Sequence, residues 1–147
     1  MCDCKNGTEA KFRRWFTGEL TRRGRWWTRV EAARGGHIGF PDLCVLDGAD
    51  GSGLMRPIEL KVGDIKQDRV RVLAKKMLKA GLRPAQINWW LEFEQAGGTG
   101  MIVVGVHSCN DGRWLVYWTR GYRALEAKSG LAIGHKDGWQ DLNMDDV

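Results

Sequence analysis

The sequence lacks any run of eighteen consecutive apolar residues, and its opening segment MCDCKNGTEAKF lacks the apolar core of a signal peptide. We therefore expect no segment that enters a membrane, and we expect a cytoplasmic protein. The 147 residues also contain no internal repeat and no low-complexity block. With 43% hydrophobic residues, the chain can bury enough apolar surface for one domain. We expect that domain to have its core at about 8–120 and a loose acidic tail at about 136–147.

Cysteine and histidine are scarce, with four and three residues. Only Cys2 and Cys4 form a tight pair, and the histidines are scattered along the chain. Because a structural zinc site needs four converging ligands, we do not expect one here. We interpret the four cysteines as reduced thiols, as is typical of a cytosolic protein.

The net charge of +5 is unevenly distributed. Residues 1–40 carry nine Lys or Arg against four acids, and residues 61–84 carry eight against two. Between these basic segments, residues 41–60 carry one Arg against four acids. Clustered basic residues suit a polyanion, because neutralising phosphates releases condensed counterions, and an acidic pocket suits a divalent metal. Charge runs of this kind can also be solvated helix faces.

The order of helical and strand patterns predicts an α/β fold with one mixed β-sheet flanked by helices. Its α-β-β-β-α-α-β-β order consists of a helix at 8–23, strands at 26–33, 42–46 and 57–62, helices at 67–80 and 84–95, and strands at 101–106 and 113–118. A short helix is possible at 122–128.

The chemistry of this chain is concentrated on two of the expected strands. Glu59 and Lys61 are two residues apart, so alternation places them on one face of their strand. If the preceding strand pairs with it, Asp42 lies beside Glu59. Two close carboxylates repel one another, and a divalent cation compensates them. Mg²⁺ or Mn²⁺ could be held by Asp42, Glu59 and the backbone carbonyl of Leu60, with Lys61 beside an attacking water.

These residues also have an ordinary structural reading. Glu59 and Lys61 could be an exposed ion pair on an edge strand, and Asp42 could be a turn residue.

The surrounding motifs resemble those of the PD-(D/E)XK nuclease superfamily, within it the small phage-type and Holliday-junction-resolvase-like members. The matching segments are GFPD at 39–42, IELK at 58–61 and PAQ at 84–86 with Trp89, preceded by Glu9 and by RVE at 29–31. The resemblance covers roughly residues 8–107 and implies a restriction-endonuclease-like fold.

The resemblance implies a role for each matching residue. Asp42 and Glu59 would be metal ligands, Lys61 the catalytic lysine, and Gln86 a helix residue that faces the same pocket. Glu9 would complete the metal site directly or through water, although it can equally be an ordinary first-turn acid.

The implied activity is metal-dependent cleavage of DNA, with branched or Holliday-junction DNA as the favoured substrate and a homodimer as the favoured assembly. The setting would be the cytoplasm of a bacterium or phage-infected cell. We expect DNA contacts from five basic residues, Arg29, Lys66, Arg69, Lys75 and Lys76. The role of Glu31 stays open, because it may simply pair with Arg29.

Three alternatives remain open on the sequence alone. The protein could be a nicking or single-strand nuclease, a catalytically silent DNA-binding module of the same fold, or a module whose basic helices bind an acidic protein.

Eight tryptophans permit either core packing or stacking on unpaired bases. We expect core positions for Trp15, Trp90 and Trp118, and a surface face for Trp26, Trp27 and Trp89.

Overall fold

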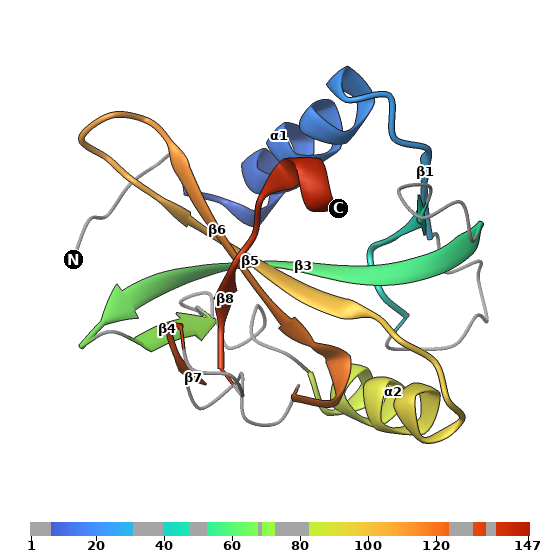
Figure 1. The fold of residues 1–147 in the computed structure, drawn as a ribbon. Coiled ribbons are helices and arrows are strands. Elements are labelled where there is room, and N and C mark those ends of the chain that lie inside the picture. Colours follow the sequence, from blue (N-terminus) through green and yellow to red (C-terminus); the bar gives the residue numbers. More distant parts are fainter. Residues whose placement is uncertain are drawn as a thin grey trace.

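A mixed β-sheet with helices on both faces forms the fold (Figure 1). The structure is a computed structural model that describes residues 7–30, 40–47, 53–67, 69–72, 83–123, 131–134 and 138–147. The strands are β1 (Trp27–Arg29), β2 (Leu43–Asp47), β3 (Leu54–Lys66), β4 (Arg69–Val72), β5 (Met101–His107), β6 (Trp114–Arg120), β7 (Leu131–Ala132) and β8 (Gln140–Asp141). The helices are α1 (Glu9–Arg22), α2 (Pro84–Gln95) and the 3-10 turns η1 (Gly121–Arg123) and η2 (Met144–Asp146).

The strand order is β1-β2-β3-β5-β6-β8, and β4 pairs with both β3 and β7. The central pair, β3 and β5, is parallel, whereas the neighbouring pairs are antiparallel. The expected α/β class and mixed sheet are therefore confirmed, but the expected element order is not matched.

The two main helices lie close to where the sequence predicts them. Thr8 caps α1, since its hydroxyl accepts a hydrogen bond from the Lys11 N–H at 3.3 Å. Pro84 opens α2, where a missing N–H costs nothing and the fixed φ suits a first turn.

The helix predicted at 67–80 is wrong over the part that the structure describes. Residues 69–72 form β4, which pairs with the end of β3. The RVRV sequence alternates with period two and its valines are β-branched, so it suits a strand. Gln67 makes the reversal with φ of 52°. Residues 73–80 lie outside the described part of the chain.

Two further expectations need correction. The short helix expected at 122–128 is represented by the single turn η1, and residues 124–128 lie outside the described residues. The acidic tail expected to be loose is packed over its described part, 138–147, because Trp139, Met144 and Val147 are buried in the core. Their burial holds the tail despite its surrounding acids.

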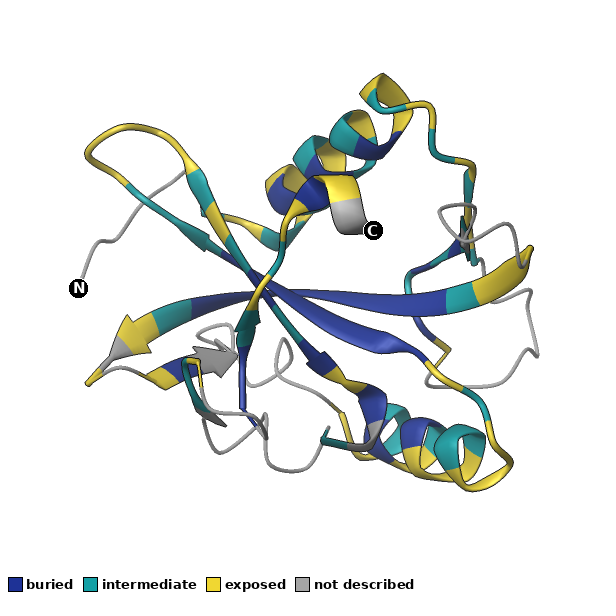
Figure 2. Cartoon of the chain, in the orientation of Figure 1, coloured by how far each residue is buried: buried dark blue, intermediate teal, exposed yellow. Residues whose placement is uncertain are grey.

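The sheet separates two hydrophobic cores (Figures 1 and 2). On one face, Phe12, Phe16 and Leu20 of α1 pack on β2, β3 and β5 together with the η2 segment. On the other face, Ile87 and Trp90 of α2 pack with Ile102, Val104 and Trp139. The C-terminal segment therefore supplies apolar side chains to both cores.

Close contacts with glycine fix how the helices lie against the sheet. A Cβ on Gly105 would come within 2.4 Å of the Phe12 ring of α1. The Trp90 indole of α2 packs against two glycines, so that a Cβ on Gly100 or Gly121 would come within 2.5 or 2.1 Å of it. Any side chain at these positions would push a helix away from the sheet.

Candidate active site

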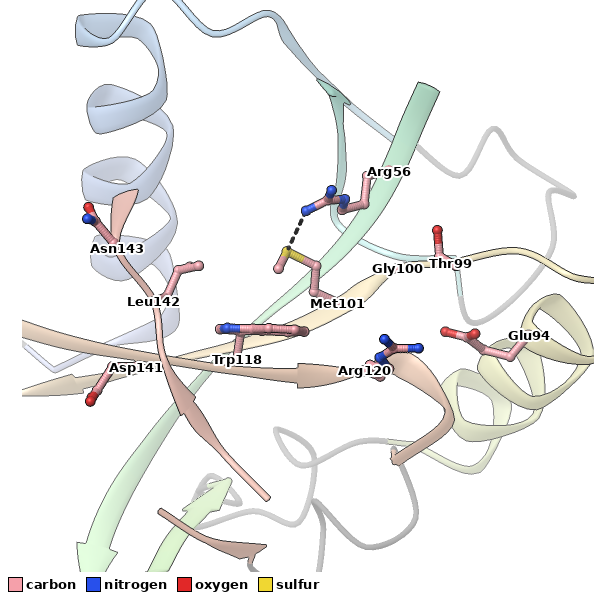
Figure 3. A pocket seen from close by; sticks show the side chains of 10 residues that line it. All are labelled: Arg56, Glu94, Thr99, Gly100, Met101, Trp118, Arg120, Asp141, Leu142 and Asn143. Carbon is pink, nitrogen blue, oxygen red and sulfur yellow. Dashed lines mark hydrogen bonds between the residues drawn. The ribbon is translucent and has the colours of Figure 1, made fainter. Parts of the chain in front are cut away.

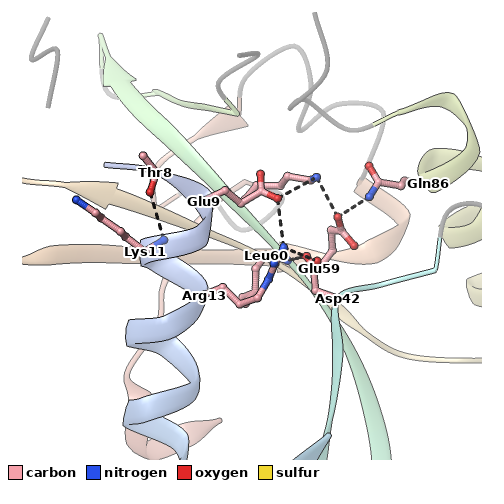
Figure 4. A network of polar contacts seen from close by, with 9 residues as sticks. Thr8, Glu9, Lys11, Arg13, Asp42, Glu59, Leu60 and Gln86 are labelled. Carbon is pink, nitrogen blue, oxygen red and sulfur yellow. Dashed lines mark hydrogen bonds and ion pairs between the residues drawn. The ribbon is translucent and has the colours of Figure 1, made fainter. Parts of the chain in front are cut away.

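The site forms at a fork in the sheet, where β2 and β3 separate (Figure 4). Their pairing ends at Leu43 and Ile58, while β3 continues as far as Lys66. Asp42 lies directly before β2, and its Oδ2 accepts the backbone N–H of Leu60 at 2.8 Å. Because the N–H and C=O of one strand residue point to the same side, the Leu60 carbonyl also faces this edge.

Glu59 is buried on the α2 side of the sheet. It alternates along β3 with Ile58 and Leu60, which belong to the core under α1. Only 1% of Glu59 is exposed. Burial raises the pKa of Glu59 to about 8, and the nearby Asp42 charge adds to this rise, while Lys61 opposes it. The alternative of an exposed edge-strand pair is therefore excluded.

The two oxygens of Glu59 differ. Oε1 accepts a hydrogen bond from Gln86 Nε2 at 2.6 Å and lies 3.1 Å from Lys61 Nζ. Oε2 is buried and has no hydrogen-bond partner among the residues that the structure describes. A buried carboxyl oxygen without a partner is costly, so a fold has no reason to keep one unless it serves another purpose.

Lys61 connects the two sides of the site. Its side chain is 6% exposed, and its Nζ lies 3.1 Å from Glu59 Oε1 and 3.9 Å from Glu9 Oε1. Glu9 belongs to the first turn of α1, so this helix reaches the lysine from the opposite side of the strand to α2. An ammonium shared by two carboxylates is held in place without neutralising both of them.

Arg13 is a functional candidate that the sequence reading missed. Its Nη2 donates to Asp42 Oδ1 at 2.9 Å and lies 3.5 Å from Glu9 Oε1. The only available signal was the four-residue spacing from Glu9 along one helix, which also describes many ordinary surface pairs. Its contact with Asp42 joins residues 29 positions apart, which the sequence does not reveal.

Gln86 belongs to the site and is held at both ends. Its Oε1 accepts the Arg83 N–H at 3.0 Å, which caps α2, and its Nε2 donates to Glu59. The first turn of α2 therefore determines the orientation of the Glu59 carboxyl group.

The structure thus brings Glu9, Asp42, Glu59, Lys61 and Gln86 to one place (Figure 4). It does not arrange their acids as a ready metal site. Within the described part of the chain, no three Asp, Glu, His or Cys side chains converge to hold an ion. Lys61 and Arg13 lie between the acids instead. The carboxylates of the site and the Leu60 carbonyl are nevertheless oxygen donors, which Mg²⁺ prefers. One of these oxygens, Glu59 Oε2, has no hydrogen-bond partner among the described residues.

The predicted DNA-contacting residues are only partly described. Arg29 of β1 and Arg69 of β4 are exposed. Lys75, Lys76 and Glu31 lie outside the described residues, and so does the side chain of Lys66.

The three tryptophans expected in the core pack there, but of Trp26, Trp27 and Trp89, which were expected on a surface face, only Trp26 is exposed. Trp27 is partly buried and packs against the α1-side core. Trp90 is fully buried, and Trp15 and Trp118 pack against the α1-side core, whereas Trp26 is 53% exposed. Trp89 stacks on Phe93 with ring centroids 4.8 Å apart and contacts Phe40 at 5.8 Å. Its ring is therefore engaged in packing.

The interpretation of all four cysteines as reduced thiols is wrong. Cys109 is disulfide-bonded. Cys44 is a free thiol whose pKa is raised by burial.

A separate hollow of about 420 Å³ is lined by none of the acids of this site (Figure 3). It contains no predicted site residue. Its charged lining consists of Arg56, Arg120, Glu94 and Asp141, so neither sign of charge prevails.

Among the described residues, no helix is both long and apolar enough to span a membrane.

Comparisons with known proteins leave the function to be argued from this geometry. No protein-family model matches the chain. No curated protein matches its sequence. Among solved structures, it is similar to Hjc, a Holliday junction resolvase from the archaeal hyperthermophile Archaeoglobus fulgidus. The identity is 15% and the TM-score 0.48, over 92% of this chain and 89% of that one.

Proposed function

We propose that this protein is a metal-dependent endonuclease that hydrolyses phosphodiester bonds in DNA. The single observation that supports this most strongly is Glu59, a buried acid with one unpartnered oxygen, beside a buried lysine and next to Asp42. Perturbed ionisable groups of this kind concentrate at functional sites.

The donor set fits a hard divalent cation. Asp42, Glu59 and the Leu60 carbonyl would hold Mg²⁺ or Mn²⁺, and Glu9 would hold it directly or through water. When bound, the ion supplies a Lewis acid that lowers the pKa of a bound water and neutralises phosphate charge.

The chain's own residues do the remaining work. Lys61 Nζ, fixed between Glu59 and Glu9, orients a water molecule and stabilises the negative charge that develops on the phosphoryl oxygens. Gln86 keeps the Glu59 carboxyl group turned into the site. Asp42 keeps the Leu60 strand edge at the fork through its hydrogen bond to the Leu60 N–H.

The proposed substrate is branched DNA, including four-way junctions, cut by a homodimer that places one site at each strand. This finer proposal follows the motif resemblance, and Arg29, Lys66, Arg69, Lys75 and Lys76 are its proposed DNA contacts. A nicking or single-strand nuclease is the nearest alternative.

Cleavage of a DNA panel tests the proposal. The panel comprises four-way junction, flap, nicked, duplex and single-stranded DNA, with Mg²⁺ or EDTA, for the wild type and Glu59→Ala. We expect cutting only by the wild type with metal, and binding by both proteins. A wild type that binds DNA but cuts none of these with Mg²⁺ or Mn²⁺ would instead identify a silent DNA-binding module.

A further inference from the structure

The unusual feature of the site is that the Arg13 guanidinium contacts Asp42, an acid that is expected to bind metal. Arg13 Nη2 lies 2.9 Å from Asp42 Oδ1, while Asp42 Oδ2 already accepts the Leu60 N–H. Both oxygens of this carboxylate are therefore engaged. A divalent ion could reach Asp42 Oδ1 only if Arg13 withdrew.

The surroundings of Arg13 suit a cation that can be exchanged. The side chains of Arg13 and Asp42 are 27% and 19% exposed, so both are accessible from solvent. Glu9 Oε1 lies 3.5 Å from the same Nη2, and the Glu9 side chain is 19% exposed. The guanidinium thus lies beside two of the three acids at once, which reduces their mutual repulsion while no metal is bound.

The other acid of the site, Glu59, is covered at one oxygen only. Lys61 and Gln86 both contact Glu59 Oε1, and Glu59 Oε2 has no hydrogen-bond partner within the described part of the chain. The site therefore has one unpartnered oxygen and one carboxylate oxygen covered by an arginine.

We infer that Arg13 is a positioning residue. While no metal is bound, it contacts Asp42 at the oxygen where a divalent cation would bind, and cation binding displaces Arg13. The inference rests on the proposed function, because it concerns the same metal. Arg13 keeps Asp42 aimed at the fork before metal arrives. Because Arg13 and the metal ion compete for Asp42 Oδ1, Arg13 lowers the affinity for metal. Bound metal weakens the Arg13–Asp42 pair to the same degree.

Mn²⁺ binding without DNA tests the exchange. Electron paramagnetic resonance would give the Mn²⁺ affinity of the wild type, Arg13→Gln and Arg13→Lys. Arg14→Gln is the matched control, because Arg14 is the next residue of α1, is exposed, and loses the same charge. We expect Arg13→Gln to bind Mn²⁺ about fivefold to tenfold more tightly than Arg14→Gln, and Arg13→Lys to stay near the wild type. A merely structural arginine would leave affinity unchanged or weaken it, and either result would overturn the inference.

The wild type provides a second measurement that does not depend on a variant folding. In side-chain NMR spectra of the arginines, saturating Mg²⁺ should shift the Arg13 Nε resonance and speed exchange of its Nη protons, while Arg14 stays unchanged. An Arg13 signal that does not respond to bound Mg²⁺ would refute displacement.

A Glu59→Gln sample separates the two proposals. If neither it nor the wild type binds Mn²⁺, the metal site and the nuclease proposal fail together. If only the wild type binds but Arg13→Gln is no tighter, the nuclease proposal stands and the exchange is rejected.

Discussion

The two central acids of the site, Asp42 and Glu59, are held in opposite ways. Asp42 is partly exposed, faces a guanidinium and accepts a backbone N–H. Glu59 is buried, and its pKa is raised to about 8. Glu59 shows that a neighbouring positive charge does not by itself keep a buried acid ionised. Lys61 contacts Glu59, yet burial has the larger effect on its pKa.

Removing either acid should have the largest effect, on cleavage. We expect Glu59→Gln and Asp42→Asn each to lower the single-turnover rate in Mg²⁺ by roughly a thousandfold, because each removes a metal-facing charge. Binding of the same DNA in Ca²⁺, measured by fluorescence anisotropy, should stay within about threefold. An Asp42→Asn protein that kept a tenth of the activity would remove Asp42 from the mechanism.

Burial of Glu59 should make the free energy of unfolding depend on pH. The folded pKa of Glu59 is raised, so its favourable contribution is complete below about pH 4.5 and is lost as pH rises through about 8. Without metal, we expect this to lower the free energy of unfolding by roughly 3 to 5 kcal/mol at most between about pH 4.5 and about pH 9. Urea unfolding should show that loss in the wild type and not in Glu59→Gln.

Asp42→Asn is the informative control for that measurement. It leaves Glu59 buried, so most of the pH-dependent loss should persist. Equal slopes for the wild type and Glu59→Gln would mean that Glu59 is not the group responsible.

A smaller effect is expected from the helix that orients Glu59. Gln86→Leu removes the amide that donates to Glu59 Oε1 at 2.6 Å, and we expect about a tenfold loss of cleavage rate. Asn88→Leu, an exposed position on the same helix, is the control and should cost less than about twofold. Similar losses in both variants would assign the effect to α2 as a whole.

The smallest effect should come from the cap of α1. Thr8→Ala removes the hydroxyl that accepts the Lys11 N–H and should lower the free energy of unfolding by about 1 kcal/mol. Because Glu9 and Arg13 lie in the first turns that the cap stabilises, cleavage should fall by less than about threefold. Thr8→Ser should restore both properties, and a failure to do so would point to packing rather than capping.

The elements with a clear period and clear end signals could be predicted from sequence. Both main helices carry such signals, Thr8 before α1 and Pro84 at the start of α2. The strand β4 was missed because Val70 also begins a helical stripe that continues with Leu73, Ala74, Met77 and Leu78 in the sequence, and pairing with β3 decided between the two. Burial of Trp139 depends on β6 and α2, which no local pattern in an acidic tail reveals.

The site was predictable where its residues share a strand. Glu59 and Lys61 are two apart on β3, so alternation alone places them together. Asp42 could be added because β2 precedes β3 and the two strands pair. Arg13 could not, since its partner is chosen by how α1 lies across the fork rather than by spacing.

The seat of Trp90 between Gly100 and Gly121 has a consequence for how the site is lost. Because the Trp90 ring packs so closely against both glycines, α2 cannot slide or turn in small steps while the ring remains in place. Gln86 lies one turn earlier on that helix. On heating, the hydrogen bond from Gln86 to Glu59 should therefore be lost abruptly when the ring leaves its position.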